Sequence, residues 1–290
     1  MKTDASEVGG KSPGVATTAK GGRAPRHLGD GHWRLPTDAA AAVDALANPR
    51  EPVCRWDFAA PGEAGLVSNG REPYRLIEMA GPMTRGSDGP TGGATLEFEE
   101  GQWLRCPRAE CPALNFHGRD ARFTLVAWVR RRPKSHDECE VVAGMWNETQ
   151  RTRQYCLFLN LQIWDSVDQA CGHLSATGAP TPGYKYCMEA AIGATRLGFD
   201  EWHHVAFSYD GVWARVYVDG RFDYRPGLNP YFWPRPINDG GPNGSDFTVG
   251  AVFRAGAMGN WFRGSLGGLA VYDACLSDAE IARLWSERRV

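Results

Sequence analysis

One stretch of this sequence constrains the fold more than any other: two short runs of alternating apolar residues joined by a tight turn. The runs are 205–209 and 212–216, and apolar side chains recur at every second position in each. A period of two puts alternate side chains on opposite faces of a strand. Asp210-Gly211 lies between the runs and accepts the positive φ that a tight hairpin turn requires. The segment 201–220 is therefore predicted to be a β-hairpin.

Similar strand patterns recur along most of the chain. They occur at 54–58, 94–98, 123–130, 140–145, 155–163, 246–252 and 264–272. The 35 glycines and 19 prolines supply many turns, as expected for a fold of short strands. Long helical patterns are not interleaved with the strands, which favours a sandwich over βαβ units. We predict an all-β, antiparallel two-sheet jelly-roll sandwich over residues 51–290.

The two ends of the chain are predicted to differ from this domain. Residues 1–50 are expected to be a disordered tail, because the first part of it has almost no large apolar side chains to offset the entropy of ordering. An alanine-rich helix is predicted near 36–47. A second short helix is predicted after Ser277, with Ser277 as N-cap and Glu280 completing a capping box.

Charge and hydropathy exclude some classes of partner. The net charge is -2, so no basic field indicates a nucleic acid. No apolar run reaches the roughly 18 residues that a membrane-spanning helix needs. The N-terminal segment does not resemble a signal peptide, so the default expectation is a cytoplasmic protein, or an extracellular one if the N-terminus is incomplete.

The eight cysteines allow two interpretations. In an oxidising compartment they would supply disulfides, whereas in a reducing one they would be small buried apolar residues. We favour reduced, mostly buried thiols. A zinc site is disfavoured, because no C-x-x-C pair or Cys/His cluster has ligand spacing.

Four segments together resemble one known family. These segments are 93–104, 123–129, 202–220 and 247–277. In this order they are similar to the laminin-G-like domains of the concanavalin A-like lectin/glucanase superfamily, over about residues 53–285. The resemblance implies two antiparallel sheets, one of them curved, with a concave face where glycans or proteins bind. It also implies that His203 and His204 are structural residues of the hairpin.

Many members of that family hold calcium near the chain ends. Here the usual acidic position of the closing strand is Gly267 or Gly268. Calcium prefers several oxygen ligands, including carboxylates, so the loss of one weakens this site. Asp57, Asp246 and Asp273 remain candidate ligands, although turn-capping and surface roles are favoured for each.

The segment 144–191 is not generic for the fold and is expected to carry the function. Strand alternation predicts that one set of side chains points into the core, namely Tyr155, Leu157, Leu159 and Leu161. The opposite set is Gln154, Cys156, Phe158 and Asn160. We expect a groove on that opposite face.

Candidate site residues follow from this placement. The candidates for catalysis are Glu148, Arg153, His173 and Tyr184, and those for ligand binding are Trp146, Asn147, Gln154, Asn160 and Tyr186. Arg153 is expected beside Glu148 across a hairpin, while a long loop would deliver His173 and Tyr184. Simpler roles compete: an exposed ion pair is worth roughly 0–1 kcal/mol, His173 can satisfy a buried carbonyl, and the tyrosines can be packing residues.

Three functions are consistent with these residues. The preferred one is recognition of an oligo- or polysaccharide. The alternative is a carbohydrate-active enzyme using the same groove. A lyase would need groups that neutralise a uronate together with a base and an acid, whereas a glycoside hydrolase would need two carboxylates. A protein-interaction domain is the third.

Overall fold

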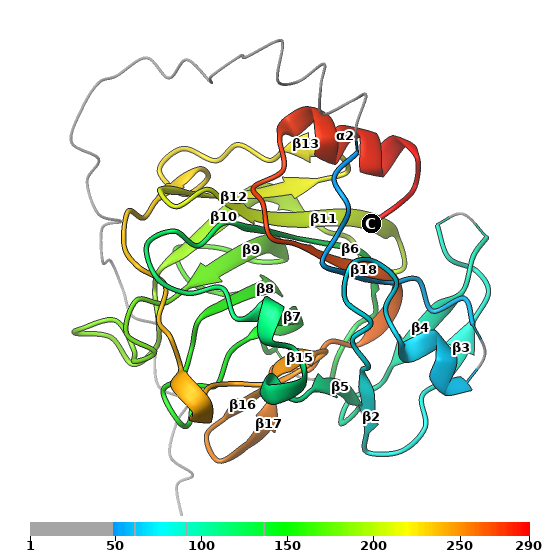
Figure 1. The fold of residues 1–290 in the computed structure, drawn as a ribbon. Coiled ribbons are helices and arrows are strands. Elements are labelled where there is room, and N and C mark those ends of the chain that lie inside the picture. Colours follow the sequence, from blue (N-terminus) through cyan, green and yellow to red (C-terminus); the bar gives the residue numbers. More distant parts are fainter. Residues whose placement is uncertain (1–48, 61, 91, 136) are drawn as a thin grey trace, which may run out of the picture. The chain divides into compact units, whose positions relative to one another are not determined.

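The structure is a computed structural model that describes residues 49–60, 62–90, 92–135 and 137–290. The predicted helix at 36–47 and all but the last two residues of the predicted tail lie outside the described residues. The described part is built from two antiparallel sheets that face each other, with a short helix near the C-terminus (Figure 1). The predicted two-sheet sandwich is confirmed.

The larger sheet has the strand order β13-β12-β11-β6-β18-β4-β3, with β1 added beside β18 and β14 beside β12. Its strands are β1 (Cys54–Trp56), β3 (Arg85–Gly86), β4 (Thr95–Phe98), β6 (Phe123–Arg131), β11 (Trp202–Tyr209), β12 (Trp213–Val218), β13 (Arg221–Phe222), β14 (Tyr231–Phe232) and β18 (Gly264–Tyr272). β18 lies between β6 and β4 and also pairs with β1, which are all far from it in sequence, so the sheet ties the two ends of the domain together.

The smaller sheet has the order β10-β9-β8-β7-β15-β5-β2. Its strands are β2 (Ile77–Met79), β5 (Trp103–Cys106), β7 (Glu140–Met145), β8 (Tyr155–Leu159), β9 (Gln169–Leu174), β10 (Ala190–Arg196) and β15 (Phe247–Val249). A separate hairpin, β16 (Val252–Arg254) and β17 (Ala257–Gly259), pairs only with itself among the named strands. Short 3-10 turns occur at η1 (Gly62–Leu66), η2 (Arg108–Glu110), η3 (Pro112–Leu114) and η4 (Gly241–Asn243).

The predicted hairpin is formed by β11 and β12. Phe207 lies opposite Val216 in its register. Gly211 has a φ of 96°, and the Asp210 carboxylate accepts hydrogen bonds from the two backbone amides that follow the glycine. The turn is therefore fixed by the residues that predicted it.

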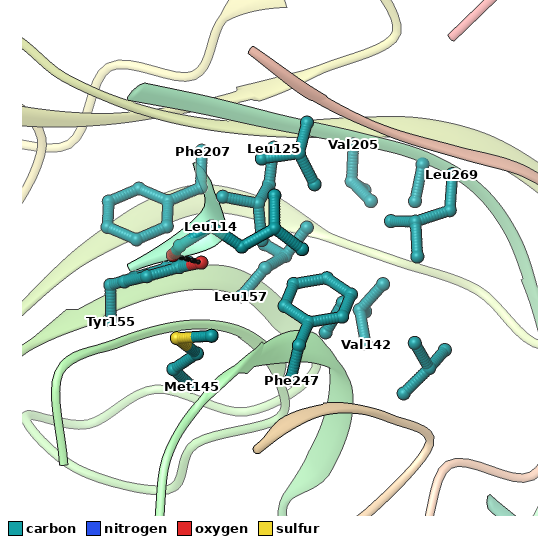
Figure 2. Close-up of a cluster of buried hydrophobic side chains, with 14 of the residues drawn as sticks. Leu114, Leu125, Val142, Met145, Tyr155, Leu157, Val205, Phe207, Phe247 and Leu269 are labelled. Carbon is teal, nitrogen blue, oxygen red and sulfur yellow. Dashed lines mark hydrogen bonds between the residues drawn. The ribbon is translucent and has the colours of Figure 1, made fainter. Parts of the chain in front are cut away.

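Apolar side chains from the two sheets meet in one core (Figure 2). Leu125, Val205 and Phe207 come from the larger sheet, and Leu157 and Phe247 from the smaller one. The one polar tip among the labelled side chains is satisfied, because the Tyr155 hydroxyl donates to the Leu114 carbonyl at 2.7 Å. Figure 2 shows this bond at the edge of the cluster.

The close approach of the sheets leaves no room at Gly172 on β9. A Cβ atom there would lie 2.1 Å from a ring carbon of Phe207. Gly172→Ala should therefore lower the free energy of unfolding by about 1–3 kcal/mol, the usual cost of overpacking, as measured by urea denaturation. Gly198→Ala is the matched control, because its Cβ would meet only the exposed Glu201 carboxylate, which can move. Equal losses in both variants would contradict the packing argument.

The outer face of the larger sheet is covered by α2 (Asp278–Ser286). The predicted capping box is present: the Ser277 hydroxyl accepts from the Glu280 amide, and the Glu280 carboxylate accepts from the Ser277 amide. In Figure 1 this helix lies beside β13. No helix in the described part of the chain is long and apolar enough to cross a membrane.

All eight cysteines are free in the structure. Six are buried, and Cys139 and Cys275 are half-buried. Burial raises the pKa of the Cys171 thiol to about 12 and that of Cys187 to about 11. The Cys171 and Cys187 thiols are therefore protonated packing residues at neutral pH. The burial expected for most of the cysteines is present.

Candidate functional site

The outer face of the smaller sheet carries a second apolar cluster, distinct from the core. Cys156 and Phe158 of β8 belong to it, whereas Tyr155, Leu157 and Leu159 belong to the core. The predicted alternation along β8 is thus confirmed.

The prediction for Leu161 is wrong. The strand ends at Leu159, and Asn160 adopts a φ of 52°. This left-handed conformation breaks the period of two, so Leu161 packs with Cys156 and Phe158 on the outer face instead of in the core.

A pocket of about 280 Å³ opens on this outer face. The residues that line it are Asp137, Glu138, Cys139, Trp146, Glu148, Arg153, Phe158, Leu161, Gln162, Ile163, His173, Tyr186, Cys187, Arg254 and Asn260. We call it the main pocket. It combines apolar and aromatic side chains with several charged ones, the composition typical of a small-molecule site.

His173 lies on β9, opposite Cys156 of β8, and so in a strand rather than in the loop from which it was expected. Its ring centroid is 4.5 Å from that of Trp146 and 5.6 Å from that of Phe158, both edge to face. Burial, and secondarily the positive charge of Arg153, lowers the pKa of His173 to about 3. The imidazole is therefore neutral at ordinary pH, and neither ring nitrogen has a hydrogen-bond partner in the structure.

Arg153 and Glu148 form the expected pair across the turn after β7. The Arg153 Nη2 lies 3.5 Å from Glu148 Oε2, and its Nη1 donates to the Gly178 carbonyl at 2.9 Å. The Arg153 side chain is only 3% exposed, so this is not the exposed surface pair that was the simpler alternative. Glu148 Oε1 also accepts from Trp146 Nε1 at 3.4 Å and Asn260 Nδ2 at 3.5 Å.

A second charged pair, which was not predicted from the sequence, also lines the main pocket. Arg254 Nη1 donates to Glu138 Oε1 at 2.7 Å and to Asn260 Oδ1 at 2.5 Å. Arg254 ends β16, where Ala255 and Gly256 turn the chain with φ values of 48° and 84°. The signal was an Ala-Gly dipeptide between two short strand-like runs, at 252–254 and 257–259.

Tyr186 and Tyr184 end up in different places, although both come from the loop between β9 and β10. Tyr186 lines the main pocket and is 42% exposed. Tyr184 is equally exposed but does not line the pocket; its ring packs edge to face against Trp164, 6.1 Å between centroids.

Three further candidates also lie outside the main pocket. The Asn147 side chain caps its own turn through the backbone amide and side chain of Gln150. Gln154 bonds instead with Arg108, at 2.6 Å, and with Asn115. Asn160 lines a neighbouring pocket. Of the nine candidates, the structure brings together Trp146, Glu148, Arg153, His173 and Tyr186.

The metal candidates do not converge. Asp246 accepts from Arg105 and Asp273 pairs with Arg71, at 2.7 and 2.6 Å. Asp57 accepts from the Ala59 amide and from the Asn69 side chain. No three His, Cys, Asp or Glu side chains in the described ranges are grouped to hold a metal ion.

The closing strand also lacks room for an acidic side chain. A Cβ at Gly267 would lie 2.6 Å from Pro90 Cδ, and one at Gly268 3.0 Å from Val290. Since the candidate carboxylates bond with arginines or amides and do not meet, these residues do not fit a calcium ion.

The chain belongs to the concanavalin A-like lectin/glucanases superfamily, whose family model matches residues 108–282. This span is more than half of the chain, and it contains the main pocket. The resemblance of the four segments is therefore confirmed. A search of the curated proteins finds no match.

Several solved structures share the fold. Domain 4 of an extracellular GH43 arabinanase from Geobacillus stearothermophilus, in complex with arabinotriose, is 15% identical with a TM-score of 0.52, covering 81% of this chain and 98% of that one. A Trypanosoma rangeli sialidase in complex with sialic acid is 18% identical, with a TM-score of 0.51 and coverage of 81% and 32%.

The binding domain of botulinum neurotoxin serotype G is 10% identical, with a TM-score of 0.53 and coverage of 82% and 51%. This chain therefore spans about half the length of the neurotoxin binding domain and about a third of the sialidase chain. At these identities the likeness concerns the fold.

Proposed function

We propose that the protein recognises a carbohydrate in the main pocket. The observation that carries this proposal is the pairing of an aromatic and apolar floor with two arginine–carboxylate pairs in one 280 Å³ pocket. A sugar ring has apolar C–H faces and a rim of hydroxyls that both donate and accept. Aromatic rings suit the faces, and carboxylates and guanidinium groups suit the rim.

The polar wall is arranged before a ligand arrives. Glu148, Asn260 and Arg254 are linked by hydrogen bonds, and Arg254 continues the chain to Glu138. Such a network holds its acceptors and donors in place, which reduces the ordering cost of binding. Tyr186, half-exposed among the lining residues, supplies an aromatic surface from the long loop.

The experiment is a carbohydrate screen followed by calorimetry on Glu148→Gln. This change keeps the size of the side chain and removes a charged acceptor, so we expect a loss of affinity of about tenfold or more, from the roughly 1.5–3 kcal/mol of a charged hydrogen bond. Glu110→Gln is the control, because Glu110 is exposed and does not line the pocket. If no saccharide in a broad panel binds, or if both variants bind like the parent, the proposal fails.

Glycoside hydrolysis is the second candidate, favoured by one observation: Glu138 and Glu148 line the same pocket, and hydrolysis uses two carboxylates. If the protein releases reducing ends in the same screen and Glu148→Gln abolishes this release, the function is hydrolysis and not binding alone. Lyase chemistry has weaker support. The low pKa of His173 makes it a poor base, and Tyr184 lies outside the pocket lining.

A further inference from the structure

A second pocket, of about 300 Å³, adjoins the main pocket. Asp137 lines both of them. Asn160 of the second pocket and Gln162 of the main pocket both donate through their side-chain amides to Asp137 Oδ1. Asp137 Oδ1 therefore accepts from one side chain of each pocket, and the residue is exposed where the pockets meet.

The second pocket contains an aromatic surface of its own. Phe199 is 43% exposed. One side of its ring packs on the guanidinium group of Arg131, whose Cζ lies 4.6 Å from the ring centroid. A cation on one face leaves the remaining exposed surface of the ring for an apolar partner.

Buried charges hold the guanidinium group that packs against this ring. Arg131 is 1% exposed and donates to Glu140 at 2.9 and 2.8 Å, to Asp168 at 2.7 Å and to the Leu197 carbonyl at 2.8 Å. These bonds hold the guanidinium group against which the Phe199 ring packs. The cation on one face of the ring is thus in place before any ligand binds, which lowers the ordering cost of using this surface.

The charges of the two pockets indicate the class of ligand. The described lining residues include four cations, Lys134, Arg131, Arg153 and Arg254, and five carboxylates, Asp137, Glu138, Glu140, Glu148 and Asp168. Each arginine among them is paired with a carboxylate. Lys134 donates to the carbonyls of Glu138, Cys139 and Trp261. An anionic sugar would therefore meet a net negative lining and cations that are already engaged.

We infer that the two pockets are adjoining subsites for one uncharged oligosaccharide. One sugar unit occupies the main pocket and the next stacks on Phe199, while Asp137 accepts hydroxyl hydrogen bonds between them. The assignment of the main pocket rests on the function proposed above. The second subsite rests on Phe199 and Asp137, and it extends the binding surface beyond a single sugar.

The test is calorimetry on the full chain with ladders of uncharged arabino-, xylo- and gluco-oligosaccharides, from the monosaccharide upward. We expect affinity for the parent protein to rise by about two- to tenfold once the ligand reaches the second subsite, the size of one aromatic contact. Phe199→Ala should remove this rise and leave monosaccharide binding unchanged. Phe232→Ala is the matched control, because Phe232 is 49% exposed and lies on β14, outside both pockets.

The outcomes separate the two proposals. Affinity that does not depend on ligand length, or a rise that survives in Phe199→Ala, would overturn the second subsite and leave the main pocket intact. Binding of uronate or sialylated oligosaccharides as tightly as neutral ones would overturn the uncharged class. Failure of both the neutral ladders and the charged oligosaccharides to bind would remove the function of the main pocket and the subsite with it. Melting curves of the variants check that each is folded.

Discussion

Glu140→Ala is expected to lower the free energy of unfolding by about 3–5 kcal/mol, the range for breaking one side of a buried ion pair. Glu140 is 1% exposed and accepts two hydrogen bonds from Arg131, which is equally buried. Burial opposes the charge of Arg131, but Glu140 and Asp168 outweigh it and raise the arginine pKa overall. Without Glu140, the Arg131 guanidinium stays buried with Asp168 as its remaining carboxylate partner.

Urea denaturation measures this loss of stability, and two further variants serve as controls. Glu287→Ala removes an exposed partner of Arg289 and should cost about 0–1 kcal/mol. The double variant Arg131→Met with Glu140→Leu should be more stable than Glu140→Ala, because it removes both charges together. A loss below about 1 kcal/mol in Glu140→Ala would show that the pair contributes no more than a surface pair.

Acid should destabilise the protein through two buried histidines. Burial lowers the pKa of His173 to about 3 and that of His204 to about 4, against about 6.5 in an unfolded chain. The unfolded state therefore binds more protons between these values, so stability rises with pH across this window. The stability that depends on neutral histidines is fully present above about pH 6.5 and is lost as the pH falls through the folded pKa values. At about 1.4 kcal/mol per pKa unit, the two histidines together account for several kcal/mol.

The test is to measure the free energy of unfolding from pH 7 down to pH 5. On unfolding in acid, each buried histidine takes up about one proton. His173→Gln and His204→Gln should each reduce the slope of stability against pH, by up to about 1.4 kcal/mol per pH unit. Restricting the range to this window limits the contribution of carboxylates, which titrate mainly below it. His117→Gln removes an exposed histidine and serves as control. If the parent and the two buried-site variants have the same slope, the buried histidines do not cause the acid sensitivity.

The fold was predictable because its main signals are local. Alternation and an Asp-Gly turn define the β11–β12 hairpin, and Ser277 with Glu280 defines the start of α2. These patterns depend on residues a few positions apart, whose geometry the backbone itself restricts. The inward and outward sets of β8 follow from the same rule, and the rule stops where Asn160 takes a positive φ.

The candidate site was only partly predictable, because its residues come from segments far apart in the chain. Glu148 and Arg153 are five residues apart, so a hairpin sufficed to pair them. Glu138 and Arg254 are separated by 116 positions and meet only through the sheet order. Tyr184 and Tyr186 are two residues apart in one loop, and no periodicity says which of them turns toward the pocket.

The β16–β17 hairpin shapes the main pocket without being part of the two sheets of the sandwich. It supplies Arg254 to the main pocket and is anchored by Phe253, whose carbonyl accepts from the Glu148 amide at 2.8 Å. Neither strand of it belongs to the two large sheets. Changes in its length or turn can therefore alter one wall of the main pocket while the strands of the two sheets keep their register. This hairpin is thus the segment to exchange when a new ligand preference is engineered.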